Sequence, residues 1–131
     1  SVFNPSPTNG LVWQVWSEKA RKQGQDDGKL VLVDITADWC ITCKANKQFV
    51  LERKPLATML AELVDNNRLV MLQADWTRPD PSILAFLASQ HRFGIPFNII
   101  YGPEAPNGIV LGELLSMRMI EQALIDAGMK R

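Results

Sequence analysis

The residues of this chain best suited to chemistry are Cys40 and Cys43, and they are its only cysteines. They follow the apolar run Leu30–Val33 and stand where a helical pattern begins. A strand that leads into a Cys-x-x-Cys pair at the start of a helix is the arrangement of a redox-active site. The spacing therefore predicts thiol–disulfide chemistry.

The two thiols have different predicted roles. At a helix N-terminus the first cysteine faces unpaired backbone N–H groups and the positive end of the helix dipole, and both stabilise the nucleophilic thiolate. The second cysteine lies one turn further on, close enough to attack a mixed disulfide made by the first. We therefore predict that Cys40 is the attacking, more exposed thiol and Cys43 the buried resolving thiol. Ile41 and Thr42 add no positive charge that would make the disulfide more oxidising, which favours a reductant.

Other uses of a cysteine pair fit the chain less well. Zinc needs about four ligands, whereas the chain offers two cysteines and one histidine, His91, which we place at a helix end with no catalytic role. Covalent haem attachment needs a histidine directly after the second cysteine, where the chain has Lys44. A purely structural disulfide would close a very short loop, which constrains the unfolded chain least. We expect no metal and no organic cofactor, only the Cys40–Cys43 disulfide.

A second candidate group is Asp34, which interrupts the apolar run six residues before Cys40. A carboxylate inside a buried strand is partly desolvated, and this raises its pKa. Because the position lies beneath the expected helix start, we predict that Asp34 exchanges protons with the Cys43 thiol during disulfide exchange. The alternative is an ordinary strand-end acid that binds water. Asp38 is expected to be a solvated loop acid.

The segment Gly94–Phe97 comes directly before a predicted strand and contains Pro96. A proline there can be trans and purely structural, or cis, which is rare outside special sites; the residues alone leave both open. A cis bond would place the backbone of Ile95 beside the cysteines, where it could pair with a substrate chain as an added strand. The candidate substrate-binding residues are Trp39, Ile41, Thr42 and Ile95.

Length and composition describe one globular domain with a real core. The chain has 131 residues, 47% apolar and 21% charged, with a formal net charge of zero and no basic stripe to bind nucleic acid. Its apolar runs are too short to cross a bilayer. The start, Ser1–Pro5, lacks the basic and long apolar regions of a signal peptide, so we expect a mature or excised fragment. Two cysteines suit a reducing cytosol or an oxidising periplasm.

The elements that must position these residues can be read from the apolar patterns. Strands are predicted at residues 12–15, 30–36, 69–74, 97–101 and 109–111. Helices are predicted at residues 18–25, 40–50, 56–65, 81–91 and 117–127, with Leu56, Leu60 and Leu63 forming a core stripe. Residues 1–11 are expected to be a linker or lead-in and residues 12–131 the domain. The predicted class is α/β, with a central mixed β-sheet flanked by helices.

The segment Val33–Lys44 resembles the active site of thioredoxin-like domains. It is most similar to the C-terminal periplasmic (gamma) domain of DsbD-type transmembrane thiol:disulfide interchange reductases. The segments Gln73–Thr77 and Phe93–Asn98 extend this match. Within that family the chain looks closest to the ScsB branch, which is linked to copper tolerance. The resemblance covers residues 12–127.

The resemblance implies a thioredoxin-like fold and a thiol:disulfide oxidoreductase of the protein-disulfide reductase type. In such proteins a membrane domain carries electrons from cytoplasmic thioredoxin, and the C-terminal domain passes them to an N-terminal domain or to periplasmic partner proteins. The implied location is periplasmic, as a soluble domain of an inner-membrane protein. Carried over to this chain, Cys40 is the nucleophile, Cys43 the resolving thiol, Asp34 the buried acid and Pro96 the cis-proline.

One position departs from the family. Members often carry an acid four residues after the second cysteine, where it helps to hold the thiol pKa high, but this chain has Lys47. A cation there would act in the opposite sense if it comes near. The thiol pKa values of relatives therefore cannot be copied to this chain.

The sequence thus predicts a domain that relays electrons by dithiol–disulfide exchange from a membrane domain to periplasmic partners. One alternative is a thiol oxidase or disulfide isomerase, which the reduction potential would distinguish. Another is a chaperone or copper-binding module of thioredoxin fold that uses the cysteines as ligands. The lack of methionine and histidine near Cys40 counts against copper, since a soft Cu(I) site could use such ligands.

Overall fold

Five strands pair into one mixed sheet in the order β1-β3-β2-β4-β5. The computed structural model describes residues 11–130. β1 and β2 run parallel to β3, whereas β4 runs antiparallel to both β2 and β5. The strands are β1 (Gln14–Val15), β2 (Leu30–Thr36), β3 (Leu69–Asp75), β4 (Phe97–Gly102) and β5 (Ala105–Val110).

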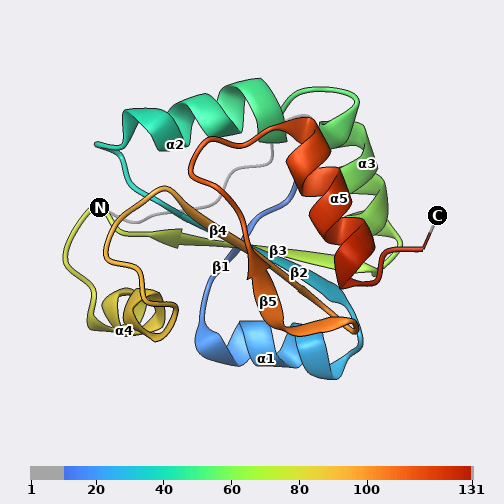
Figure 1. The fold of residues 1–131 in the computed structure, drawn as a ribbon, viewed down its shortest axis with the longest axis horizontal. Helices are drawn as coiled ribbons and strands as arrows, with labels where there is room; N and C mark the ends of the chain where they lie inside the picture. The colour runs from blue at the N-terminus through green and yellow to red at the C-terminus, as the bar shows by residue number, and fades with distance from the viewer. Residues whose placement is uncertain (1–10, 131) are drawn as a thin grey trace.

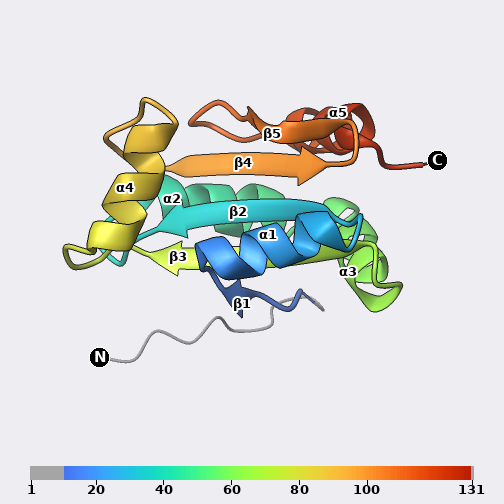
Figure 2. The same ribbon diagram turned by 90° about the horizontal axis from the view of Figure 1, so that it is seen from below.

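Helices cover both faces of this sheet. Figure 1 shows α2, α3 and α5 along one face and α1 and α4 along the other, and Figure 2 shows α1 in front of β2 and β3 with α2 behind them. The predicted class, a mixed sheet flanked by helices, is confirmed. The helices are α1 (Glu18–Asp26), α2 (Ile41–Asn46), the π-helical segment η1 (Lys47–Leu51), α3 (Leu56–Asp65), α4 (Pro81–Ser89) and α5 (Met117–Ala127).

The sheet divides the core into two parts, and the central strand β2 contributes side chains to both. Successive side chains of a strand point to opposite faces. Leu30 and Leu32 pack on the face of α3 and α5, whereas Val31 and Val33 pack on the face of α1 and α4. All four are buried, which agrees with the continuous apolar run in the sequence.

Four helices end in the same way, with one residue in the left-handed conformation. These residues are Gly28, Asn67, His91 and Gly128, with φ between 58° and 122°. In each case the next N–H bonds back to a carbonyl five residues earlier, as Arg92 N does to Leu87 O at 2.9 Å. We expected His91 to be the last residue of its helix, and this prediction is wrong. It is exposed and lies beyond the end of α4 at Ser89.

Two strands differ from the prediction. β1 is shorter than residues 12–15, because Gln14 and Val15 alone pair with β3. β5 begins earlier than Ile109, because the turn after Gly102 is tight and pairs that glycine with Ala105. Leu11, which we assigned to the lead-in, is fully buried in the core. The rest of the predicted lead-in lies outside the described residues.

The helix predicted over residues 40–50 is divided. It starts as α2 and continues as η1, where Glu52 N bonds to Lys47 O at 2.8 Å, five residues back. Pro55 then separates it from α3, as predicted. The stripe of leucines on α3 faces the core, with Leu56 and Leu60 buried and Leu63 packed against them.

Candidate active site

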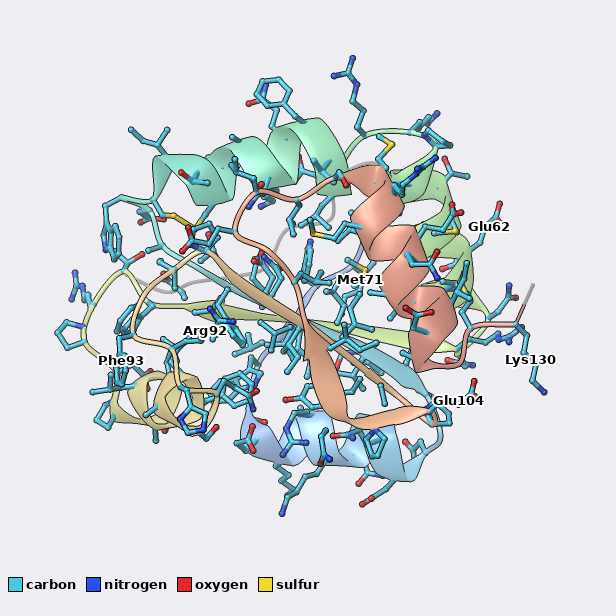
Figure 3. All side chains as sticks on the ribbon, in the orientation of Figure 1. Glu62, Met71, Arg92, Phe93, Glu104 and Lys130 are labelled. Atoms are coloured by element: carbon cyan, nitrogen blue, oxygen red, sulfur yellow. A yellow bond between two sulfur atoms is a disulfide. The ribbon has the colours of Figure 1, made fainter. Side chains whose placement is uncertain are left out.

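Cys40 and Cys43 form a disulfide at the N-terminus of α2. Cys40 is the N-cap residue, and its Sγ accepts a hydrogen bond from the backbone N–H of Cys43 at 3.2 Å. The two Cα atoms are 5.3 Å apart, and Figure 3 shows the bond in yellow at the start of α2. The first sulfur thus occupies the place where unpaired N–H groups and the helix dipole stabilise negative charge.

The two cysteines do not differ in exposure in this disulfide form. We predicted that Cys40 is the more exposed thiol, but Cys40 is 6% exposed and Cys43 is 5% exposed, so the disulfide form shows no real difference. Both pack with Ala37 and Ile95 in a small apolar cluster. Ile95 thus lies beside the cysteines, as the sequence predicted for a cis bond before Pro96.

Asp34 is buried on the sheet face that α2, α3 and α5 cover. It shares that face with Leu32, two residues earlier on β2. Burial raises the pKa of the Asp34 carboxyl from 3.8 to about 6, although a hydrogen bond from Gln73 and the charge of Lys47 both lower it. Gln73 Nε2 donates that bond to Asp34 Oδ2 at 3.0 Å. A carboxyl with such a pKa can gain or lose a proton near neutral pH.

Lys47 lies one turn beyond Cys43, where η1 begins. Its charge reaches Asp34 and lowers the pKa of that carboxyl. Its Nζ also lies 3.6 Å from Oε2 of Glu52. The departure from the family that we noted in the sequence therefore acts on the buried acid of the site.

The Ile95–Pro96 peptide bond is cis, as the family resemblance implied. A second cis bond, Lys54–Pro55, lies between η1 and α3 and was not predicted. Ile95 is half-buried against the cysteine cluster. The segment before β4 thus lies beside the cysteines, where a substrate chain would have to approach Cys40.

The loop after β3 holds the residues that precede Cys40. Asp38 N donates to Thr77 Oγ1 at 2.9 Å, and Trp39 Nε1 donates to Thr77 O at 3.1 Å. Thr77 is held in turn by Asp75, whose Oδ1 accepts from Thr77 N at 3.0 Å and from the Thr77 hydroxyl. Asp38 is exposed, as predicted. The Asp75–Thr77 segment therefore has a physical role in orienting Trp39.

An apolar cleft of about 640 Å³ opens next to Trp39. Its walls come from the loop after β3, from α4 and from the segment before Pro96, and they include Trp76, Leu84, Phe93 and Ile95. Trp39 is 59% exposed and Phe93, labelled in Figure 3, is 76% exposed. Ile41, which is 83% exposed, adds apolar surface beyond Cys40. Exposed aromatic surface beside a reactive group is typical of a protein-binding site.

The structure brings together most of the predicted site residues. Cys40, Cys43 and Ile95 pack together at the start of α2, with Ile41 exposed and Thr42 partly exposed on its first turn. Asp34 is buried on the sheet face that α2 covers, where the charge of Lys47 reaches it. Two buried polar residues, Gln73 and Asn98, lie opposite Asp34 in the strand register but were quoted only as part of the family match. Each interrupts an apolar strand, which is the one signal that could have identified them.

Metal-binding clusters and membrane-spanning helices are both absent from the part of the chain that the structure describes. Within residues 11–130, no group of three or more histidine, cysteine, aspartate or glutamate side chains could hold a metal ion. Within the same range, no helix has both the length and the apolar character needed to span a membrane.

A model of the family described as thioredoxin-like matches residues 12–103, well over half of the chain. The chain belongs to the thioredoxin-like family. This thioredoxin-like chain is 29% identical over 112 residues to the thiol:disulfide interchange protein DsbD of Vibrio cholerae, a match that covers 83% of the chain and 17% of the relative. It is 33% identical over 95 residues to DsbD of Cronobacter sakazakii, covering 70% of the chain and 16% of the relative. The chain thus spans only a small part of the length of these relatives.

Solved structures share the thioredoxin-like fold. The oxidised C-terminal domain of Neisseria meningitidis DsbD has a TM-score of 0.60 at 23% identity, covering 84% of this chain and 99% of that one. A DsbH oxidoreductase also has a TM-score of 0.60, at 16% identity, covering 99% of this chain and 93% of that one. With its Cys40–Cys43 disulfide, this thioredoxin-like chain is a thiol:disulfide oxidoreductase.

Proposed function

We propose that this domain relays electrons in the periplasm, as a soluble part of an inner-membrane protein. Its electron donor is a transmembrane domain of the same polypeptide. Its acceptors are an N-terminal periplasmic domain or periplasmic thioredoxin-like disulfide proteins. The observation that carries the proposal is the disulfide at the N-cap of α2, on the face of the sheet where Asp34 is buried. The similarity to DsbD over most of the chain supports it. Assignment to the ScsB branch stays a prediction.

In the first half of the cycle the disulfide accepts two electrons. A donor thiolate attacks Cys40 Sγ, a new S–S bond forms, and the Cys40–Cys43 bond breaks with Cys43 leaving as a thiolate. Neutral Asp34 gives its proton to that thiolate. The second donor thiolate then attacks the donor sulfur of the mixed disulfide. The donor leaves as a disulfide, and the domain is left with a Cys40 thiolate and a Cys43 thiol.

In the second half the dithiol passes the electrons on. The Cys40 thiolate attacks the acceptor disulfide and displaces one acceptor sulfur, which takes a proton from water. Ionised Asp34 takes the proton of Cys43, and the Cys43 thiolate attacks Cys40 Sγ. The Cys40–Cys43 disulfide forms again, and the second acceptor sulfur leaves and is protonated. No metal or organic cofactor takes part in this scheme.

The surface around Cys40 would hold the partner during both halves. Trp39, Ile41 and Thr42 flank the attacking sulfur, and the Ile95 backbone next to cis-Pro96 would pair with an extended partner segment. The cleft beside Trp39 would take an apolar side chain of that partner.

Trapping of mixed disulfides tests the proposal. The Cys43→Ser protein lacks the resolving thiol, so it should accumulate a stable mixed disulfide with the oxidised N-terminal domain of a DsbD protein. The matched Cys40→Ser protein should form none and should have lost exchange. If Cys43→Ser traps nothing, or if both variants trap equally, the relay role is wrong.

A further inference from the structure

Three polar side chains form a row across the buried face of the sheet. In the strand register Asp34 lies opposite Gln73 on β3 and opposite Asn98 on β4. The exposed fractions are 2% for Gln73, 6% for Asp34 and 1% for Asn98. On the side toward α3 and α5 the next positions on this face are the apolar Met71, Leu32 and Ile100. Buried polar groups normally have hydrogen-bond partners, so each member of this row needs one.

Asn98 has an unused acceptor. Its side-chain Oδ1 is buried and has no hydrogen-bond partner. Its backbone O accepts from Leu111 N at 2.9 Å, so its backbone polar groups point toward β5 and away from β2. Asp34 and Asn98 are therefore a non-hydrogen-bonded antiparallel pair, the type in which facing side chains come closest, with Cβ atoms about 4.5–5.5 Å apart.

The neighbours of Asp34 favour opposite protonation states. Gln73 donates a hydrogen bond to the carboxylate from β3, and Lys47 of η1 supplies a positive charge that is shared with Glu52. Both favour ionised Asp34. A protonated carboxyl instead carries an O–H that needs an acceptor, and Asn98 Oδ1 on β4 is an unpartnered acceptor at the facing position. In the oxidised protein Cys40 and Cys43 of α2 form a disulfide and do not titrate.

We propose that Asn98 is a positioning residue that accepts a hydrogen bond from protonated Asp34 and so retains the proton that Asp34 delivers to Cys43. When Asp34 gives up this proton, Gln73 and Lys47 stabilise the carboxylate that remains. Within the row, Asn98 is then the hydrogen-bond partner of protonated Asp34, and Gln73 is the partner of the ionised form. The inference rests on the proton-transfer role of Asp34 given under the proposed function.

The direct test measures Asp34 itself in the oxidised protein. Carboxyl carbon NMR follows the Asp34 titration, and isotope-edited infrared spectroscopy follows the C=O band of its protonated form. Asn98→Leu has nearly the shape of the native side chain but no acceptor. It should lower the Asp34 pKa by roughly half to one unit and move the infrared band to the position of an unbonded acid. An unchanged band and titration, or a pKa that rises, would overturn the inference.

A double-mutant cycle separates the interaction between the two side chains from the effect of each substitution on stability. The amide introduced by Asp34→Asn can donate an N–H to Asn98 Oδ1 at any pH. Asp34→Asn should therefore stabilise the protein more when Asn98 is present than in the Asn98→Leu background. Equal effects in both backgrounds contradict the inference. Asn98→Gln, which keeps the amide, serves as the second variant and should preserve part of the native infrared band shift.

The two proposals fail in different ways. If Asp34→Asn leaves the rate of exchange at neutral pH unchanged, the proton-transfer role of Asp34 is wrong, whatever the spectra show. If Asp34→Asn slows exchange but Asn98→Leu leaves the Asp34 titration and the pH profile of exchange unchanged, Asn98 is merely structural.

Discussion

Lys47 acts on Asp34 through its charge, and at the same time its ammonium lies 3.6 Å from the carboxylate of Glu52. A partly exposed ion pair is therefore connected electrostatically to a buried acid. The position of Lys47 at the start of η1, one turn beyond Cys43, makes this possible.

Replacing Lys47 with glutamine should raise the pKa of Asp34 above about 6. The positive charge that favours the carboxylate is lost, and Glu52 is left without that partner. The expected shift is roughly half a unit, measured by carboxyl carbon NMR. The matched control is Lys44→Gln, which removes an exposed lysine from α2, the helix that leads into η1. The account is contradicted if both variants give the native titration.

Ionised Asp34 should lower the free energy of unfolding at neutral pH. Its folded pKa of about 6 lies above the ordinary value of 3.8, so the folded protein binds this proton more tightly than the unfolded chain. The contribution of Asp34 to stability is therefore greatest below about pH 4 and is lost as the pH rises through 6. Asp34→Asn should raise the free energy of unfolding at pH 7.5 by up to about 3 kcal/mol.

Denaturant unfolding at two pH values checks this sign. At pH 3.5 the Asp34→Asn and native proteins should be nearly equal in stability, because Asp34 is then mostly protonated in both the folded and unfolded states. A gain that is the same at pH 3.5 and pH 7.5 would show that the substitution acts through packing and not through the buried charge.

The cleft beside Trp39 should matter for protein substrates only. Phe93→Asp places a charge on an exposed apolar wall of the cleft and should lower kcat/KM for a protein disulfide roughly tenfold. Exchange with oxidised glutathione, which is too small to need the cleft, should be unchanged. Phe49→Asp is the control, since Phe49 is 55% exposed on η1 but does not line the cleft. Equal losses for the two variants would remove the cleft from recognition.

Local patterns predicted the parts of the fold that depend on local physics. β2, α3 and α5 lie where the apolar runs, Pro55 and the Ser116 cap indicated. The α4 boundary at His91 was wrong, because an exposed histidine took the left-handed position that glycine usually fills.

The contacts that the sequence could not predict depend on how the strands pair in the sheet. Asp34 was identifiable as an acid in an apolar strand, but its partners come from strands 39 and 64 residues away along the chain. Gln73 and Asn98 face it only because of how β3 and β4 pair with β2. The contact of Ile95 with the cysteines likewise depends on the antiparallel course of β4 beside β2.

The most direct test of the relay is the equilibrium reduction potential of the Cys40–Cys43 pair. The protein is equilibrated with a series of glutathione or dithiothreitol buffers, and the oxidised fraction is read by thiol alkylation. An electron donor should give a value near the thioredoxin end of the scale, about −270 to −200 mV. A value near about −120 mV would make the domain a thiol oxidant and reverse the direction of electron flow.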